Sequence, residues 1–177
     1  MINLEDDSNK YTDDYLATHD IDWFCVINKT PIHAASNGGD LPLDIKNNRL
    51  LNEKNKRFVF NRKRKNKYNY DEININIEHL NKVIKNPENY SPFEIIEMKN
   101  NYLRTFIDMA RRGFYSYDRL IYKEFEDQKY ILVAWPKNPS SRHSYNIRKG
   151  ITNFRFESEK CVFKNIETVI KLDFNNI

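Results

Sequence analysis

One segment, residues 91–114, contains the signals for a whole helix and constrains the fold more than any other part of the chain. Ser91 is a typical N-cap, because its hydroxyl can accept a hydrogen bond from a first-turn N–H that lacks a helical partner. Glu94 completes a capping box, and Pro92 occupies the first helical position, where a missing N–H costs nothing. Gly113 is typical of the left-handed position that ends a helix. These signals predict one helix of about 20 residues, or about 30 Å.

The interior of this helix has one wide apolar face. Apolar residues recur at steps of three and four, and charged residues occupy the opposite side, which is the pattern of a helix packed on a core. The apolar face is predicted to contain Ile96, Leu103, Phe106, Ile107 and Ala110, with Met98, Tyr102 and Met109 beside them. We therefore expect this helix to be the core helix of the protein.

Segments on both sides of the helix have the length and alternation of β-strands. Before the helix, a hairpin is predicted over 22–27 and 31–35, strands over 57–61 and 68–77, and a short helix over 78–85. After it, a second hairpin is predicted over 119–125 and 129–135, a loop over 136–149, and a closing meander over 153–157, 160–164 and 168–174. The region 165–174 is equally compatible with a helix, since Asn165 is a suitable cap.

Strands gathered on both sides of one helix predict an α+β fold and argue against alternating βαβ units. We expect an antiparallel sheet, made of hairpins and a C-terminal meander, packed on one long central α-helix. The 177 residues fit one domain over 21–177. Residues 1–20 are polar and acidic, so we expect a mobile N-terminal segment there.

Positive charge is concentrated in two stretches, although the net charge is only +4. Residues 54–67 contain eight lysines and arginines and no acid, and 137–149 contain four and no acid. Such stretches attract polyanions, and aromatic residues interleaved with them can stack on bases. The binding residues predicted in the first stretch are Arg62, Lys63, Arg64 and Lys65. The alternative is a solvated face, or an edge strand protected by lysines.

Several classes of protein are disfavoured by what the sequence lacks. It contains no apolar run of about 18 residues and no signal peptide, so we expect no membrane association. Cys25 and Cys161 lie in separate apolar runs, which is typical of buried free thiols in a reducing compartment. We therefore expect a cytoplasmic protein. No Cys/His cluster has zinc spacing and no phosphate-binding fingerprint is present, so we expect neither a metal nor a cofactor.

A glycine-rich turn directly after a histidine is the first candidate site. His33 lies on a predicted strand, and Ser36, Asn37, Gly38 and Gly39 follow it. Backbone N–H groups in such a turn can form an anion-binding nest, and histidine can act as an acid or base near neutral pH. The alternative is a turn that needs positive φ, with a structural histidine on the preceding strand.

A cluster of arginines and tyrosines at the end of the long helix is the second candidate. Guanidinium groups suit phosphate or carboxylate, and tyrosines offer stacking faces and hydroxyls. The residues are Arg111, Arg112, Tyr115, Tyr117 and Arg119. The alternative is helix capping together with an ion pair from Asp118 to an arginine.

His143, flanked by Ser140, Ser141, Arg142 and Ser144, is the third candidate. A serine–histidine pair is a pattern of nucleophilic catalysis. Sequence neighbours seldom make one, however, and neither a GxSxG elbow nor an orienting acid accompanies this pair. An ordinary surface loop is the competing interpretation.

These patterns support three hypotheses about function. The first is a cytosolic protein that binds an anionic partner, either nucleic acid or a nucleotide phosphate. The second is a protein–protein interaction module of the immunity, antitoxin or effector-binding type. The third is a small phosphodiester-cleaving enzyme in which His33 or His143 is the base and Arg111, Arg112 or Arg119 holds the phosphate. The sequence leaves the oligomeric state open, and the first hypothesis requires the basic stretches to converge in the fold.

Overall fold

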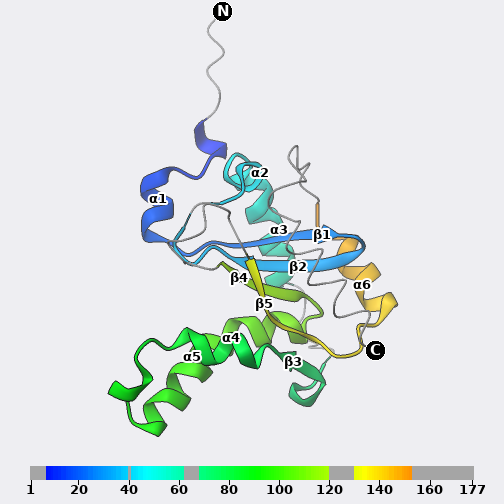
Figure 1. Cartoon of the computed structure of the whole chain (residues 1–177). Coiled ribbons are helices and arrows are strands. Elements are labelled where there is room, and N and C mark those ends of the chain that lie inside the picture. The colour runs from blue at the N-terminus through cyan, green and yellow to red at the C-terminus, as the bar shows by residue number, and fades with distance from the viewer. Residues whose placement is uncertain (1–6, 40, 62–67, 120–129, 153–177) are drawn as a thin grey trace, which may run out of the picture.

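The structure is a computed structural model that describes residues 7–39, 41–61, 68–119 and 130–152. The strands are β1 (Asp22–Ile27), β2 (Thr30–Ala35), β3 (Ile73–Ile75), β4 (Tyr115–Arg119) and β5 (Tyr130–Pro136). The α-helices are α1 (Asp13–Thr18), α2 (Leu43–Lys46), α3 (Arg49–Asn61), α4 (Ile77–Val83), α5 (Pro92–Arg111) and α6 (Ser141–Arg148). Short 3-10 turns are η1 (Asp7–Asn9), η2 (Tyr70–Glu72) and η3 (Pro87–Asn89). The predicted α+β class is confirmed, and the long helix α5 packs on the sheet (Figure 1).

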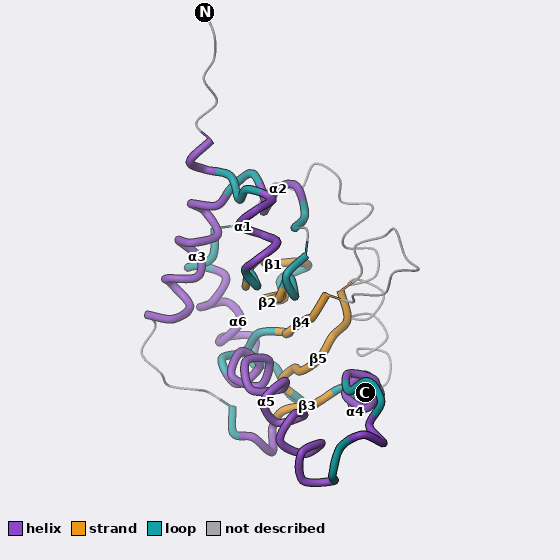
Figure 2. The backbone as a smooth tube through the Cα atoms, turned by 90° about the vertical axis from the view of Figure 1, so that its left-hand side faces the viewer, coloured by secondary structure: helices purple, strands orange, loops and turns teal. Residues whose placement is uncertain are grey.

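The five strands form one sheet in the order β1-β2-β4-β5-β3, which can be followed along the tube in Figure 2. The pairs β1–β2, β4–β5 and β3–β5 are antiparallel, and β1–β2 is the predicted N-terminal hairpin. The pair β2–β4 is parallel and brings His33 opposite Ser116. The sheet is therefore mixed, and this one parallel pair joins the N-terminal hairpin to the rest of the sheet.

Side chains of successive residues point to opposite faces of the sheet, so each strand serves two cores. On one face Trp23, Cys25, Ile32, Tyr117 and Leu132 pack with Leu16 of α1 and Ile45 of α2. The other face meets α3, α5 and α6. This second face includes the polar side chains of His33 and Ser116, which are fully buried. The face under α5 thus contains a buried histidine–serine pair from neighbouring strands.

Helix α5 has the ends predicted from the sequence. The hydroxyl of Ser91 accepts a 3.3 Å hydrogen bond from the Glu94 N–H, and the Glu94 carboxylate accepts a 2.8 Å bond from the Ser91 N–H. Gly113 has φ +95°, and the N–H of Phe114 donates to the Met109 carbonyl at 3.1 Å. These are the capping box and the glycine ending that were expected.

The first turns of α5 extend past the sheet, as Figure 1 shows. Leu103, Phe106 and Ala110 in the second half are buried, whereas Phe93 and Ile96 are 71% and 58% exposed. The prediction that Ile96 belongs to the buried stripe is therefore wrong. The apolar pattern continues along the helix beyond the point where the sheet ends.

Two other predictions of local structure are wrong. Residues 57–61 are the last turn of helix α3, because Asn52, Asn55 and Val59 form its buried stripe at helical spacing. Residues 136–149 contain α6 instead of only a loop, because the Ser140 hydroxyl caps it by accepting from the His143 N–H.

The remaining expectations are met in part. Of the predicted strand 68–77, only β3 is extended, since 70–72 form a turn closed by a capping box. Most of 119–125 and all of 153–174 lie outside the described residues.

Cys25 is fully buried, and burial raises the pKa of its thiol. Within the described residues, no helix is long and apolar enough to cross a membrane.

Candidate functional site

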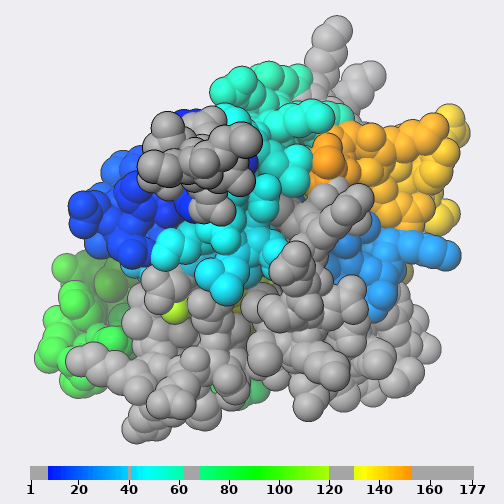
Figure 3. Space-filling view, turned by 90° about the horizontal axis from the view of Figure 1, so that it is seen from above, coloured from blue at the N-terminus to red at the C-terminus, as the bar shows by residue number. Residues whose placement is uncertain are grey.

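Described parts of the basic stretches, distant in the sequence, meet at the C-terminal end of α5. A guanidinium nitrogen of Arg112 donates to the carbonyl of Val59 on α3 at 3.1 Å. The Nε2 atom of His143 on α6 lies 2.7 Å from the carbonyl oxygen of Arg112, and the Ser140 N–H donates to the Tyr68 hydroxyl at 2.7 Å. Figure 3 shows the cyan surface of α2 and α3 adjoining the orange surface of α6.

A groove of about 780 Å³ lies beside this junction. We call it the basic groove, because three arginines and two aromatic residues are among those that line it. These five are Phe60, Tyr70, Arg104, Arg111 and Arg112. Its acidic lining residues are Asp22 and Asp108.

The three arginines differ in how much of their charge the fold already uses. Arg112 is 12% exposed and forms an ion pair with Asp108 at 3.0 Å. Arg111 donates from Nε to the Tyr68 carbonyl at 3.1 Å. Arg104 is exposed and forms no ion pair with any residue that the structure describes. Arg104 and the outer part of Arg111 are therefore the charges available to a ligand.

The aromatic residues of the basic groove are unusually open to solvent. Tyr70 is 68% exposed and Phe60 is 43% exposed. The guanidinium of Arg111 lies 4.0 Å from the centre of the Tyr70 ring, and that of Arg112 lies 5.7 Å from the centre of the Phe60 ring. Aromatic rings beside guanidinium groups can accept a stacked base while the cations contact its phosphates.

His33 lies in the interior. It is fully buried, with Nδ1 2.7 Å from the Ser116 hydroxyl and Nε2 3.0 Å from Oδ1 of Asp22. Burial acts to raise the pKa of Asp22, but the hydrogen bond and charge of His33 outweigh it, so that pKa is lowered. The set has the members of a serine–histidine–aspartate triad. Ser116, however, is fully buried, so no substrate can reach its hydroxyl.

The glycine-rich turn after β2 binds a carboxylate of the chain itself. Oδ1 of Asp20 accepts a 2.7 Å bond from the Asn37 N–H and a 3.1 Å bond from the Ser36 hydroxyl. Asn37 and Gly38 have φ of +51° and +66°, which explains the composition of the turn. A Cβ on Gly39 would lie 1.8 Å from Nη1 of Arg119, so this glycine permits a close approach.

Strand β4 divides the predicted arginine–tyrosine cluster. Arg111 and Arg112 remain in the basic groove, while β4 carries the chain away at about 3.3 Å per residue. Tyr115 and Tyr117 are buried in the core on the α1 face, and Arg119 lies at the far end of the strand. Arg62, Lys63, Arg64 and Lys65 lie outside the described residues.

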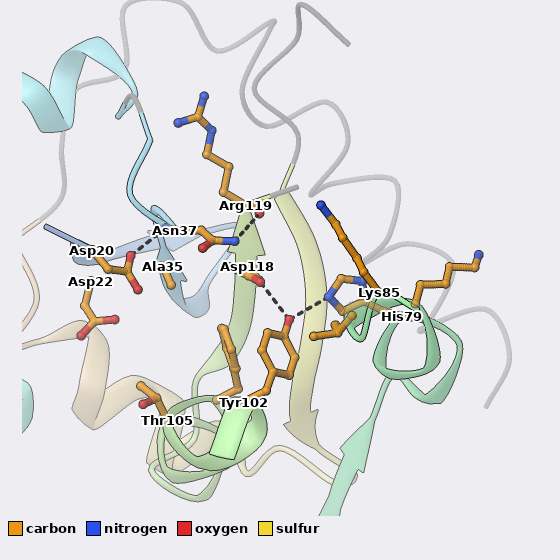
Figure 4. A pocket seen from close by; sticks show the side chains of 13 residues that line it. Asp20, Asp22, Ala35, Asn37, His79, Lys85, Tyr102, Thr105, Asp118 and Arg119 are labelled. Atoms are coloured by element: carbon orange, nitrogen blue, oxygen red, sulfur yellow. Dashed lines mark hydrogen bonds between the residues drawn. The ribbon is translucent and has the colours of Figure 1, made fainter. Parts of the chain in front are cut away.

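A second hollow, which we call the polar pocket, has a volume of about 510 Å³ and lies between α4, α5 and the ends of β2 and β4. A hydrogen-bond chain lines it (Figure 4). Nε2 of His79 lies 2.7 Å from the Tyr102 hydroxyl, which donates to Oδ2 of Asp118 at 2.8 Å. Burial, reinforced by the charge of Asp20, raises the pKa of Asp118 to about 6, against the opposing effect of the Tyr102 bond.

Several polar residues of these sites were not predicted. The sequence pattern places Tyr102 beside the apolar stripe of the helix. It indicates only one role for Asp118, an ion pair with an arginine. Ser116 and Asp118 alternate with buried Tyr115 and Tyr117, so the signal was present in the sequence. It was missed because the strand was predicted to begin at Arg119, four residues after its observed start at Tyr115.

Comparisons with protein-family models, with curated proteins and with solved structures found no match. Across the described parts of the chain, no group of three or more His, Cys, Asp or Glu residues is placed to hold a metal ion.

Proposed function

We propose that the protein binds nucleic acid and that the basic groove receives a single-stranded segment. One observation carries the proposal: the groove combines the exposed cation Arg104 with Arg111 and the exposed rings of Tyr70 and Phe60. In this arrangement Arg104 and Arg111 would contact phosphates, while the two rings would stack on bases. Such binding is largely independent of base sequence and weakens steeply with salt.

The sequence around the groove supports the same proposal. Helix α3 ends at Asn61, next to Phe60, and the chain returns to the described part at Tyr68, whose carbonyl holds Arg111. The basic residues between these points number five: Arg62, Lys63, Arg64, Lys65 and Lys67. The described residues that flank this segment thus belong to the groove or contact it: Phe60 lines it, and Tyr68 bonds to Arg111.

The test is a titration of a labelled oligothymidylate of about 20 nucleotides, followed by fluorescence anisotropy at about 50 and 200 mM salt. We expect binding that weakens at least tenfold at the higher salt. Arg104→Glu should weaken binding about fivefold or more, and Tyr70→Ala about tenfold, since base stacking contributes about 1–3 kcal/mol per base. Reversing the charge of Lys63, Arg64 and Lys65 should weaken binding equally for different base sequences.

Lys29→Glu serves as the matched control, because Lys29 is exposed on the β1–β2 turn and does not line the groove. It should change affinity less than twofold. Absence of binding at the lower salt would overturn the proposal, and so would an equal effect of Lys29→Glu and Arg104→Glu.

A protein-interaction module is the second candidate, and the exposed apolar start of α5 favours it. Phe93 and Ile96 project there, with Ile77 of α4 58% exposed as well. This candidate takes the place of the first if oligonucleotides fail to bind. We include no cleavage step, since the ring of His33 is buried and Nε2 of His143 contacts the Arg112 carbonyl.

A further inference from the structure

We propose that the polar pocket is a separate binding site for a small zwitterion, a molecule with an ammonium group and a carboxylate. The pocket volume of about 510 Å³ lies in the range of small-molecule sites. Charged side chains of both signs line it, together with the rings of Tyr102 and Phe106.

One wall of the polar pocket contains three carboxylates, and Arg119 lines the pocket beside them. Asp20, Asp22 and Asp118 all line it, and each uses one carboxylate oxygen in a bond described above. Oδ2 of Asp20 and Oδ2 of Asp22 accept no hydrogen bond from the residues that the structure describes. These oxygens are suited to an ammonium group, which donates up to three hydrogen bonds.

The opposite wall is cationic. Lys82, near the end of α4, and Lys85, just after it, line the pocket and are exposed. Lys82 pairs with Glu78, whereas Lys85 forms no ion pair within the described ranges. In Figure 4, Asp20 and Asp22 lie on one side of Tyr102, and Lys85 lies on the other with His79. The carboxylate of a ligand would therefore face the lysines while its ammonium group faces the aspartates.

Other ligand classes fit this distribution of charge less well. A simple anion would meet three carboxylates, and a simple cation would meet two lysines and Arg119. The floor between the walls contains the rings of Tyr102 and Phe106, with Ala35 and Val83 beside them, and it suits an apolar linker between two charged groups. Burial is the main cause of the raised pKa of Asp118, and an ammonium group would offset the smaller contribution that comes from the charge of Asp20.

The experiment is a titration of the ¹⁵N-labelled full chain, followed by ¹H–¹⁵N correlation spectra. The probes are the twenty L-amino acids, 4-aminobutanoate, 5-aminopentanoate and 6-aminohexanoate, so that several separations of the two charges are sampled. We expect at least one probe to bind saturably with a Kd below about 1 mM, with shifts at pocket residues. Its methyl ester, which lacks the negative charge, and its N-acetyl form, which lacks the positive charge, should each bind at least tenfold more weakly.

Two variants test the walls separately. Asp20→Asn and Lys85→Gln should each weaken binding at least fivefold, while Lys29→Gln should leave it unchanged. The side chain of Lys85 is exposed, so the variant Lys85→Gln tests the site even if Asp20→Asn disturbs the turn at Asn37. The proposal is overturned if no probe binds below about 10 mM, if the ester binds as tightly as the free zwitterion, or if Lys85→Gln has no effect. The variants that test oligonucleotide binding change Arg104 and Tyr70, which do not line this pocket. The two proposals can therefore fail independently.

Discussion

The hydroxyl of Tyr102 donates a 2.8 Å hydrogen bond to Oδ2 of Asp118, and this bond ties helix α5 to strand β4 in the middle of the sheet. Asp118 is only 5% exposed. A buried carboxyl resists ionisation, and here burial together with the charge of Asp20 outweighs the Tyr102 bond, which acts in the opposite direction. The stability of the fold should therefore depend on the protonation of this one group.

Asp118 should titrate near pH 6 in the folded protein, above its ordinary value of 3.8. Because the native state then holds the proton more tightly than the unfolded state, the stabilisation from this group is complete below pH 3.8. It is lost as pH rises to about 6. Relative to wild type, Asp118→Asn should gain free energy of unfolding between these limits, by at most roughly 3 kcal/mol. Urea unfolding at several pH values and ¹³C NMR of the carboxyl provide the measurement.

The control for this prediction is Tyr102→Phe, which removes a bond to the ionised carboxylate. It should raise the pKa of Asp118 further and leave the direction of the pH dependence unchanged. A carboxyl that titrates below about pH 4.5 in the wild-type protein would contradict the prediction.

His33→Ala should lower the free energy of unfolding by about 2–4 kcal/mol, because it opens a cavity and leaves the buried Ser116 hydroxyl without its imidazole partner. Ser116→Ala should cost about 1–2 kcal/mol, since only one bond is lost. Urea unfolding of both variants measures the difference. If the free energy of unfolding of His33→Ala lies within about 0.5 kcal/mol of the wild-type value, His33 does not have this structural role.

Asn55→Leu should destabilise the protein by about 2–4 kcal/mol, although it adds an apolar side chain to a buried helix face. The Asn55 amide donates to the carbonyls of Phe24 and Thr152 at 3.2 and 2.9 Å and accepts from the Thr152 N–H at 2.9 Å. Leucine would leave those backbone groups without these bonds. Exposed Lys54→Leu, one position away, is the matched control and should change stability little; amide exchange at Thr152 should accelerate only in Asn55→Leu.

Ser91→Ala should act locally. Loss of a helix N-cap costs about 1 kcal/mol. The first turns of α5 extend past the sheet, however, so their fraying disturbs little of the core. Amide exchange should accelerate over 92–96, while the midpoint of global unfolding moves only slightly. A large drop in global stability would mean that these turns pack on something else in solution.

The success of prediction depended on whether a signal was local. The cap, stripe and ending of α5 all lie within the helix itself; the cap and the ending were predicted correctly, and the stripe was predicted correctly for Leu103, Phe106 and Ala110 but not for Ile96. Helix α3 was missed because its buried stripe contains Asn52 and Asn55. Asparagine at a core position is explained only by partners far along the chain, such as Phe24 and Thr152.

The candidate sites show the same limit. His33 was identified as notable, but its partner Ser116 is 83 residues away and meets it only through the parallel pairing of β2 and β4. No hairpin turn signals such a pairing, because parallel strands need a long crossover connection. The convergence of Val59, Arg112 and His143 likewise depends on packing between helices that no local pattern specifies.

The parallel pair β2–β4 has a consequence for how the chain acquires its structure during synthesis. The hairpin β1–β2 emerges from the ribosome early but can join the sheet only after β4, about 80 residues later, has been made. At about 5–20 residues per second, that interval lasts several seconds, during which the inner edge of β2 has no native neighbour. The nascent N-terminal third should therefore be the stage at which this protein depends most on chaperones.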